Sequence, residues 1–122
     1  MRKKKKTLAA IEYEVGSGNV FADLGLPHPE ERMAKALLSI AIERAMEERD
    51  LTVSAAAKLT QCAKAELSRV IRGDLDDFSM DRLFRFLNAL GIDVRIHVTA
   101  KAPEAAEAHV LVTLPELVDA SS

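Results

Sequence analysis

Residues 51–73, LTVSAAAKLTQCAKAELSRVIRG, hold two short amphipathic patterns separated by a turn. Thr52 stands ahead of the first pattern, where its hydroxyl can cap a helix, and Gly73 follows the second at the position of a left-handed C-cap. The sequence therefore predicts helices over residues 53–60 and 63–72. Two helices this short, joined by a turn, form a helix-turn-helix, and that geometry restricts the fold more than any other feature of the chain.

Gln61 lies in the turn between these helices, where a sharp reversal of the chain favours glycine. If the backbone at this position has a positive φ, glutamine costs on the order of 1 kcal/mol relative to glycine. The next residue, Cys62, is expected to be a small core residue. It is the only cysteine of the chain, so no intramolecular disulfide can form, which fits a reducing cytosol.

Two further segments are predicted to be helical. Residues 30–49 carry acidic residues in the first turn and a wide apolar stripe, which indicates a helix buried on more than one side. Residues 80–90 follow Ser79 as an N-cap, end at Gly91 and have an apolar face of their own. Residues 20–31, ahead of the long helix, are interpreted as a connector.

Composition also favours a helical domain. The chain of 122 residues is 48% apolar, which is enough for a core, but it has only 4% aromatic residues and no tryptophan. A sandwich or barrel usually carries more aromatic and β-branched residues at regular intervals between turns. The predicted fold class is therefore mostly α, with four to five helices in one domain.

One strand is expected after the last helix. In residues 93–99, DVRIHVT, apolar residues alternate with polar ones, which predicts a strand with one buried face. A lone strand needs a partner, and the candidates are residues 11–15 or the same strand of a second copy across the two-fold axis of a homodimer. Residues 109–114, HVLVTL, are apolar enough to form a second strand or a docking segment.

The helix predicted over residues 63–72 has two different faces. The inward set is apolar and includes residues just before the helix: Leu59, Cys62, Ala63, Leu67, Val70 and Ile71. The outward set is small, hydroxylic and basic: Lys64, Ala65, Ser68, Arg69 and Arg72. A helix entering the major groove of DNA needs small residues for close approach and Arg or Lys to bind guanine or phosphate. The outward set therefore predicts DNA binding, and Glu66 on the flank is interpreted as a surface acid.

The same segment resembles the helix-turn-helix of the XRE/Cro/phage-repressor family, through Ala57 at the helix-crossing position, Leu67 as aliphatic anchor, and the pair Ser68–Arg69. Over residues 16–98 the chain is similar to one branch of that family, the HigA-type antitoxins, with NVFADLGLP and RFLNALG as the specific parts. The resemblance implies a lambda-repressor-like fold and a dimer that binds operator DNA and represses its own operon. It also implies a complex with a RelE/HigB-like toxin.

The resemblance assigns DNA-binding residues by position. Lys64, Ala65 and Arg69 match base-reading positions, and Ser68 and Arg72 match edge positions that contact phosphate. Thr52 and Ser54, at the start of the first helix, complete the expected DNA-binding set.

Three departures from the family pattern predict modest DNA affinity, and the first is Gln61 in place of the usual turn glycine. Val53 stands where the family often has a glutamine that holds a phosphate. Asp74, Asp76 and Asp77 follow the second helix and add negative charge close to the expected DNA.

Charge and composition divide the chain into three expected parts. Residues 1–15 form a basic arm with a short strand, residues 16–99 form the helix-turn-helix domain, and residues 100–122 form a flexible tail that is acidic and rich in alanine. Residues 1–6 hold five of the 17 basic residues, and the other 12 against 19 acidic residues leave a net charge of −7 for the rest of the chain. A DNA-binding face must therefore be local, and the basic arm can supplement it.

Several function classes are disfavoured. The three histidines lie far apart and the DLDD segment lacks the glycine and distal glutamate of a calcium loop, so we expect no metal and no cofactor. No nucleophile–base or paired-carboxylate arrangement predicts an enzyme, and no apolar run approaches the ~18 residues of a membrane span. A cytoplasmic DNA-binding regulator, expected to be an antitoxin, is the favoured hypothesis. The alternatives are a stand-alone regulator of the same family and a toxin-binding module with little DNA affinity.

Overall fold

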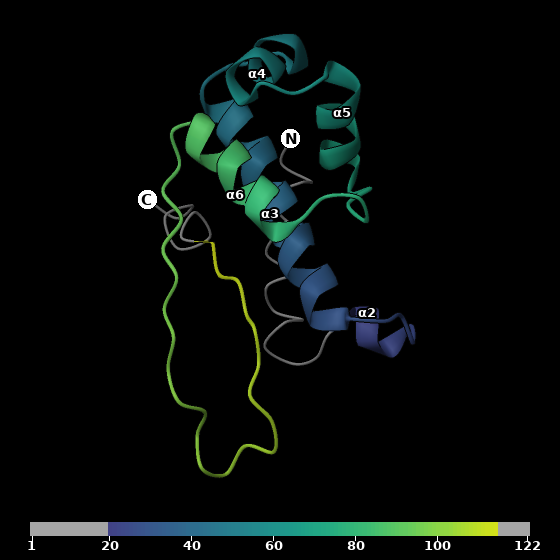
Figure 1. The fold of residues 1–122 in the computed structure, drawn as a ribbon, viewed down its shortest axis with the longest axis vertical. Helices are drawn as coiled ribbons and strands as arrows, with labels where there is room; N and C mark the ends of the chain where they lie inside the picture. Colours follow the sequence, from purple (N-terminus) through teal and green to yellow (C-terminus); the bar gives the residue numbers. More distant parts are fainter. Residues whose placement is uncertain (1–19, 115–122) are drawn as a thin grey trace. The chain divides into compact units, whose positions relative to one another are not determined.

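The computed structural model describes residues 20–114, and the described residues form five helices with no strand (Figure 1). The helices are α2 (Val20–Asp23), α3 (Pro29–Glu48), α4 (Val53–Thr60), α5 (Lys64–Arg72) and α6 (Met80–Ala89). The chain divides into two compact units. One unit is Lys35–Val94, which holds α4, α5, α6 and most of α3. The described part of the other unit consists of residues 20–34 and 95–114.

Helices α3 to α6 confirm the four predicted helices to within about one residue at each end. The two predicted N-caps are also confirmed. Thr52 Oγ1 accepts a hydrogen bond from the Ala55 N–H at 3.1 Å, and Ser79 Oγ accepts one from the Arg82 N–H at 3.1 Å. The expected connector over residues 20–31 is corrected, because its first residues form the short helix α2.

All five described helices end in the same backbone motif, in which the residue after the last turn has a positive φ. These residues are Gly25, Asp50, Gln61, Gly73 and Gly91. At the end of α4, the Gln61 N–H donates to the Lys58 carbonyl at 3.3 Å and the Cys62 N–H donates to the Ala57 carbonyl at 3.1 Å. The φ of Gln61 is 57°, so the positive φ considered for this turn is confirmed and the glutamine is strained.

Replacing Gln61 with glycine is expected to raise the free energy of unfolding by about 1 kcal/mol, because glycine adopts this φ without a steric penalty. Urea denaturation followed by circular dichroism measures the change. Gly73→Ala is the reverse control: φ is 84° and an added Cβ would meet nothing within 4 Å, so only the backbone conformation is tested. It is expected to lower stability by about the same amount. Equal stability of Gln61→Gly and wild type would show that the turn carries no strain.

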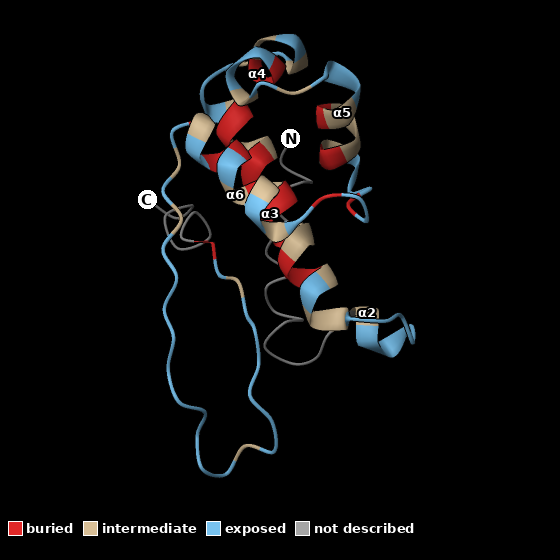
Figure 2. Cartoon of the chain, viewed as in Figure 1, coloured by how far each residue is buried: buried red, intermediate tan, exposed pale blue. Residues whose placement is uncertain are grey.

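The core of the Lys35–Val94 unit is mainly aliphatic, as the composition predicted, and it appears as the buried faces in Figure 2. Its buried apolar residues are Leu37, Leu38, Ala41, Ile42, Ala45, Met46, Ala56, Ala57, Leu67, Val70, Leu75, Phe78, Leu83, Phe86, Leu87 and Leu90. The rings of Phe78 and Phe86 meet edge to face, with centroids 6.3 Å apart. A buried hydrogen bond of 2.6 Å from Ser39 Oγ to the Val70 carbonyl joins α3 to α5. Helix α5 is therefore held to the core by both packing and a polar contact.

Of the predicted inward set only Leu67 and Val70 are buried, whereas Cys62 and Ile71 are half-buried and the other two members are exposed. The side chain of Leu59 is 42% exposed, and Ala63 is also exposed. Leu59 lies close to the buried Ala56 around the helix, three residues away, but far from the buried Ala57, so it stands at the edge of the buried face of α4. Ala63 is the N-cap of α5 with extended backbone angles, so it does not follow the periodicity of the helix it precedes.

The predicted strand at residues 93–99 is wrong for the described chain, which has neither a strand nor a helix there. Ile96 and Val98, expected on its buried face, are 72% and 85% exposed. The physical reason is that alternation supplies a strand pattern, whereas a strand also needs a second segment for its hydrogen bonds. Residues 109–114 form no strand either, and the other candidate partner, residues 11–15, lies outside the described residues together with the basic arm.

Residues 109–110 are instead bound to the first turn of α3, inside the same unit. Glu30 Oε1 accepts a hydrogen bond from the Val110 N–H at 2.8 Å, and Glu30 Oε2 pairs with His109 Nδ1. The bond from the Val110 N–H, with that from His109, holds the pKa of Glu30 below its ordinary value. This segment is thus joined to the long helix by side-chain contacts rather than by strand pairing.

Candidate nucleic-acid interface

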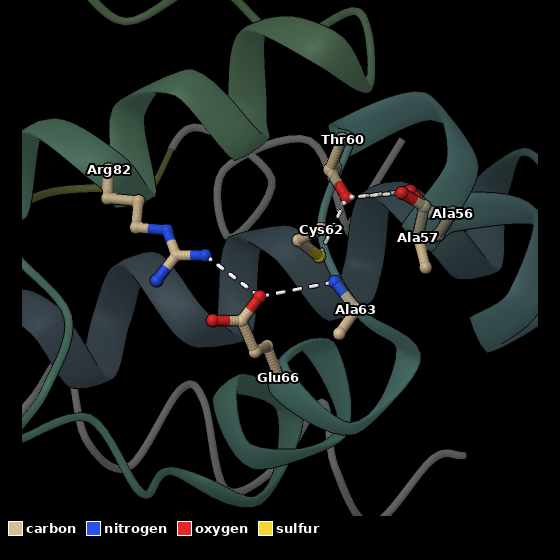
Figure 3. A network of polar contacts seen from close by, with 7 residues as sticks. All are labelled: Ala56, Ala57, Thr60, Cys62, Ala63, Glu66 and Arg82. Atoms are coloured by element: carbon tan, nitrogen blue, oxygen red, sulfur yellow. Dashed lines mark hydrogen bonds and ion pairs between the residues drawn. The ribbon is translucent and has the colours of Figure 1, made fainter.

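Helices α4 and α5 contact each other. At the start of the turn between them, the hydroxyl of Thr60 contacts both the last turn of α4 and the turn residue Cys62. Thr60 Oγ1 lies 2.9 Å from the Ala56 carbonyl oxygen and 3.2 Å from that of Ala57, so the one hydroxyl hydrogen serves both (Figure 3). Cys62 Sγ is 3.1 Å from the same hydroxyl, which leaves the thiol as the donor in that contact. Cys62 is half-buried and has a local polar role, which differs from the small core residue that we predicted.

The start of α5 is held by an acid from its own first turn. Ala63 has no side-chain acceptor for the N-cap position, but Glu66 Oε1 accepts a hydrogen bond from the Ala63 N–H at 3.1 Å. The same oxygen lies 3.0 Å from Arg82 Nη2 on α6 (Figure 3). The bond from the Ala63 N–H, followed by that from Arg82, lowers the pKa of Glu66. Glu66 is therefore more than a surface acid, because it ties the first turn of α5 to α6.

The lowered pKa of Glu66 gives a pH-dependent contribution to stability. A depressed folded-state pKa stabilises the fold above the ordinary value of 4.5 and loses this effect as pH falls through the folded-state pKa. Glu66→Gln is expected to lower the melting temperature at about pH 7 and to make little difference at about pH 3. Thermal unfolding at the two pH values measures this. Glu107→Gln, which removes an equal charge from an exposed position, should leave both melting temperatures unchanged. The same pH response in both variants would contradict a specific role for Glu66.

The structure places the seven predicted DNA-binding residues on two adjoining helices. Five of them lie on α5: Lys64, Ala65, Ser68, Arg69 and Arg72. The other two, Thr52 and Ser54, are exposed at the start of α4. On α5, the side chains of Lys64, Ala65 and Arg72 are exposed, whereas Ser68 and Arg69 are half-buried. Thr52 Oγ1 accepts the capping bond, and its hydroxyl hydrogen remains available to donate to a phosphate.

Arg69 is the predicted site residue whose surroundings differ most from expectation. Its Nε lies 3.1 Å from Asp74 Oδ2 and its Nη2 lies 2.6 Å from Asp77 Oδ2. Its guanidinium also lies 5.5 Å from the centroid of the Phe78 ring. The hydrogen bond to Asp77, and next that to Asp74, raise the pKa of Arg69. We predicted these two aspartates as repulsive charges, and the structure shows them as partners of Arg69.

Arg82 is a residue of this site that the sequence did not reveal. Its guanidinium lies 5.0 Å from the centroid of Phe78 and 5.4 Å from that of Phe86, in addition to its pair with Glu66. A signal was present in the sequence, since alanine at an N-cap followed three residues later by glutamate retains one half of a capping box. The partner on α6 is distant in sequence, so periodicity could not identify it.

Within residues 20–114, His, Cys, Asp and Glu side chains form no group of three or more that could hold a metal ion. None of the described helices combines the length and apolar character needed to cross a membrane.

Known proteins and protein families match most of the described residues. A family profile described as "Helix-turn-helix domain" matches residues 20–99. A solved structure named "Putative XRE Family Transcriptional Regulator" is 32% identical in sequence and superposes with a TM-score of 0.68. The match covers 72% of this chain and 99% of that one. No protein with curated annotation matches the sequence.

Proposed function

We infer that α5 enters the major groove of an operator, because this chain belongs to the XRE family of helix-turn-helix transcriptional regulators. The observation that carries this proposal is the outward face of α5, where Lys64, Ala65 and Arg72 are exposed while Leu67 and Val70 are buried behind them. A helix fixed to its domain along one side and basic along the other has the form that groove recognition requires.

Each exposed residue of the motif has a part in the proposed complex. Ala65 lets the backbone of α5 approach the base edges, and Lys64 beside it reaches bases or phosphate from the first turn. Arg72 in the last turn and Thr52 at the start of α4 contact phosphates on either side. Ser54 and the N–H groups of the first turn of α4 add to the phosphate contact, since a helix N-terminus attracts anions.

A homodimer is proposed as the DNA-binding form. Residues 93–99 have the alternation of a strand, and within the described part of the chain their apolar residues Ile96 and Val98 are uncovered. Pairing with the same segment of a second copy would form the hydrogen bonds of a strand pair and cover this apolar surface. Two copies would then read two half-sites of an operator. Light scattering at micromolar concentration should give the mass of a dimer, and a monomer mass would contradict it.

The more specific role that we propose is that of an antitoxin, which represses its own operon and neutralises a RelE/HigB-like toxin. Its support is the resemblance of residues 16–98 to the HigA-type branch, together with the exposed Val110 and Leu111 outside the helix-turn-helix, which offer a surface for a protein partner. Co-expression with the product of the neighbouring reading frame tests this role. An antitoxin role would be supported if the neighbouring product stops growth by itself and co-expression of this protein restores growth. A neighbouring product that does not affect growth, or the absence of such a reading frame, would favour the stand-alone regulator.

DNA binding is tested with a labelled duplex from upstream of the protein's own reading frame and an unrelated duplex of equal length. Fluorescence anisotropy at ~100 mM salt should show preference for the first. The double variant with Lys64→Ala and Arg72→Ala should weaken binding. The slope of the logarithm of the binding constant against the logarithm of the salt concentration should become shallower by about 2, since each lost phosphate contact removes nearly one. Lys101→Ala removes an exposed charge elsewhere and should bind as wild type. Failure of wild type to prefer its own upstream duplex would refute operator binding and favour a toxin-binding module.

A further inference from the structure

The guanidinium of Arg69 is already occupied in the free protein, although its backbone lies one helical turn after Ala65 on the outward side of α5. The Nε–H and Nη2–H groups form one of the forks by which arginine binds paired acceptors. Here this fork is divided between Asp74 and Asp77. The side chain of Arg69 is only 34% exposed as a result of these contacts and of the Phe78 ring.

The backbone fixes the position of the two carboxylates. Gly73 ends α5 with φ of 84°, and the Asp74 N–H donates to the Arg69 carbonyl at 2.9 Å, so Asp74 is tied to the residue that its carboxylate binds. Asp77 precedes Phe78, which is buried in the core. The backbone therefore holds both aspartates beside the end of α5, within reach of Arg69, although their side chains are 52% and 71% exposed.

We propose that Asp74 and Asp77 limit the operator affinity of this protein by competing with DNA for the guanidinium of Arg69. The proposal rests on the proposed DNA-binding function. For its Nε–Nη2 fork to pair with O6 and N7 of a guanine, Arg69 must first leave both carboxylates. Each carboxylate thus reduces the binding free energy that the arginine–guanine contact contributes. The reduction is largest for an operator, because that DNA places a guanine where Arg69 can pair with it.

This competition differs in a measurable way from simple repulsion between carboxylates and phosphates. Repulsion weakens the binding of every duplex to a similar degree, because all duplexes have the same backbone charge. Competition for Arg69 lowers the affinity for the operator more than the affinity for an unrelated duplex. This difference disappears when Arg69 is removed. Asp76, in the same loop, provides a charge-matched control.

The experiment measures the affinity of each variant for the upstream duplex and for an unrelated duplex. Asp74→Asn keeps the backbone hydrogen bond and the side-chain shape, and it should tighten operator binding roughly two- to fivefold, the upper part of the range that one exposed ion pair contributes. Binding to the unrelated duplex should change less than about twofold, as should both affinities of Asp76→Asn. In an Arg69→Ala background, Asp74→Asn should no longer favour the operator. The Arg69 Nε–H resonance, observed without DNA, should shift in Asp74→Asn and stay in place in Asp76→Asn.

The results separate this inference from the function on which it rests. Operator preference in wild type, with equal gains for Asp74→Asn and Asp76→Asn or a gain that persists without Arg69, would leave the DNA-binding function intact and overturn the competition. An Arg69 Nε–H resonance that Asp74→Asn does not move would also overturn it. Failure of every variant to prefer the upstream duplex would overturn the function and the competition together.

Discussion

Replacing Leu67 with alanine is expected to lower the free energy of unfolding by about 3 kcal/mol, the middle of the range for a buried leucine. Leu67 has no exposed surface and lies on the buried face of α5. Its truncation removes apolar contacts and leaves a cavity between α5 and the core. For a small domain with a total stability of roughly 5 to 10 kcal/mol, this loss affects DNA binding as well, because the position of α5 depends on it.

Urea denaturation of the purified variants measures this prediction, and Leu59→Ala serves as its control. Both leucines belong to the helix-turn-helix segment, but the side chain of Leu59 is 42% exposed. Its truncation should therefore cost less than about 1 kcal/mol. Equal losses for the two variants would mean that Leu59 belongs to the core, as the sequence had led us to predict.

Replacing Ala65 with glutamate is expected to weaken operator binding by about 100-fold or more, the largest effect on binding that we predict. A carboxylate at this exposed position would meet the negative field of the groove, and the longer side chain would keep α5 away from the base edges. Stability should not fall, because an acidic residue in the first turn of a helix interacts favourably with the helix dipole. The variant therefore separates loss of binding from loss of folding.

Anisotropy with the upstream duplex and thermal unfolding of the same samples measure both parts of the prediction. Ala65→Gln is the matched control, since glutamine has the size of glutamate without its charge. It should weaken binding by roughly tenfold, the cost of one lost close contact of about 1.4 kcal/mol. Binding by Ala65→Glu at the wild-type level would show that this part of α5 does not face DNA.

Helix positions and ends were predictable from the sequence because their causes are local. Thr52 and Ser79 cap the residues that follow them, and Gly73 and Gly91 end helices through their own backbone conformations. The strain at Gln61 was predictable for the same reason. The short helix α2 was missed because it has only four residues, too few for a periodic pattern.

Burial near the ends of helices was less predictable, as Leu59 and Ala63 illustrate. Residue type placed Leu59 inside and helical spacing placed Ala63 there, whereas the side chain of Leu59 is 42% exposed and Ala63 belongs to the extended backbone before α5. The expected strand at residues 93–99 failed for a different reason, because strand formation depends on a partner that the pattern itself does not contain.

The predicted DNA-binding residues were chosen from helical spacing and from the family resemblance, and their roles on DNA stay predictions. Helical spacing was sufficient to bring five of them together on one side of α5, because residues three and four positions apart lie on the same face of a helix. It could not show which of these side chains are already bound to other groups. Exposed Lys64 and Arg72 differ in this respect from Arg69, which is paired with Asp74 and Asp77.

The sequence by itself determined where helices α3 to α6 begin and end, which segment forms the helix-turn-helix, and which family the chain resembles. These properties follow from capping, periodicity and backbone preferences within a few residues of one another. Only the tertiary structure decided that Glu66 joins α5 to α6 through Arg82, and that Arg69 lies between two aspartates and the Phe78 ring. The physical reason is that ion pairs and ring contacts depend on distances between side chains, which are set by how the helices pack.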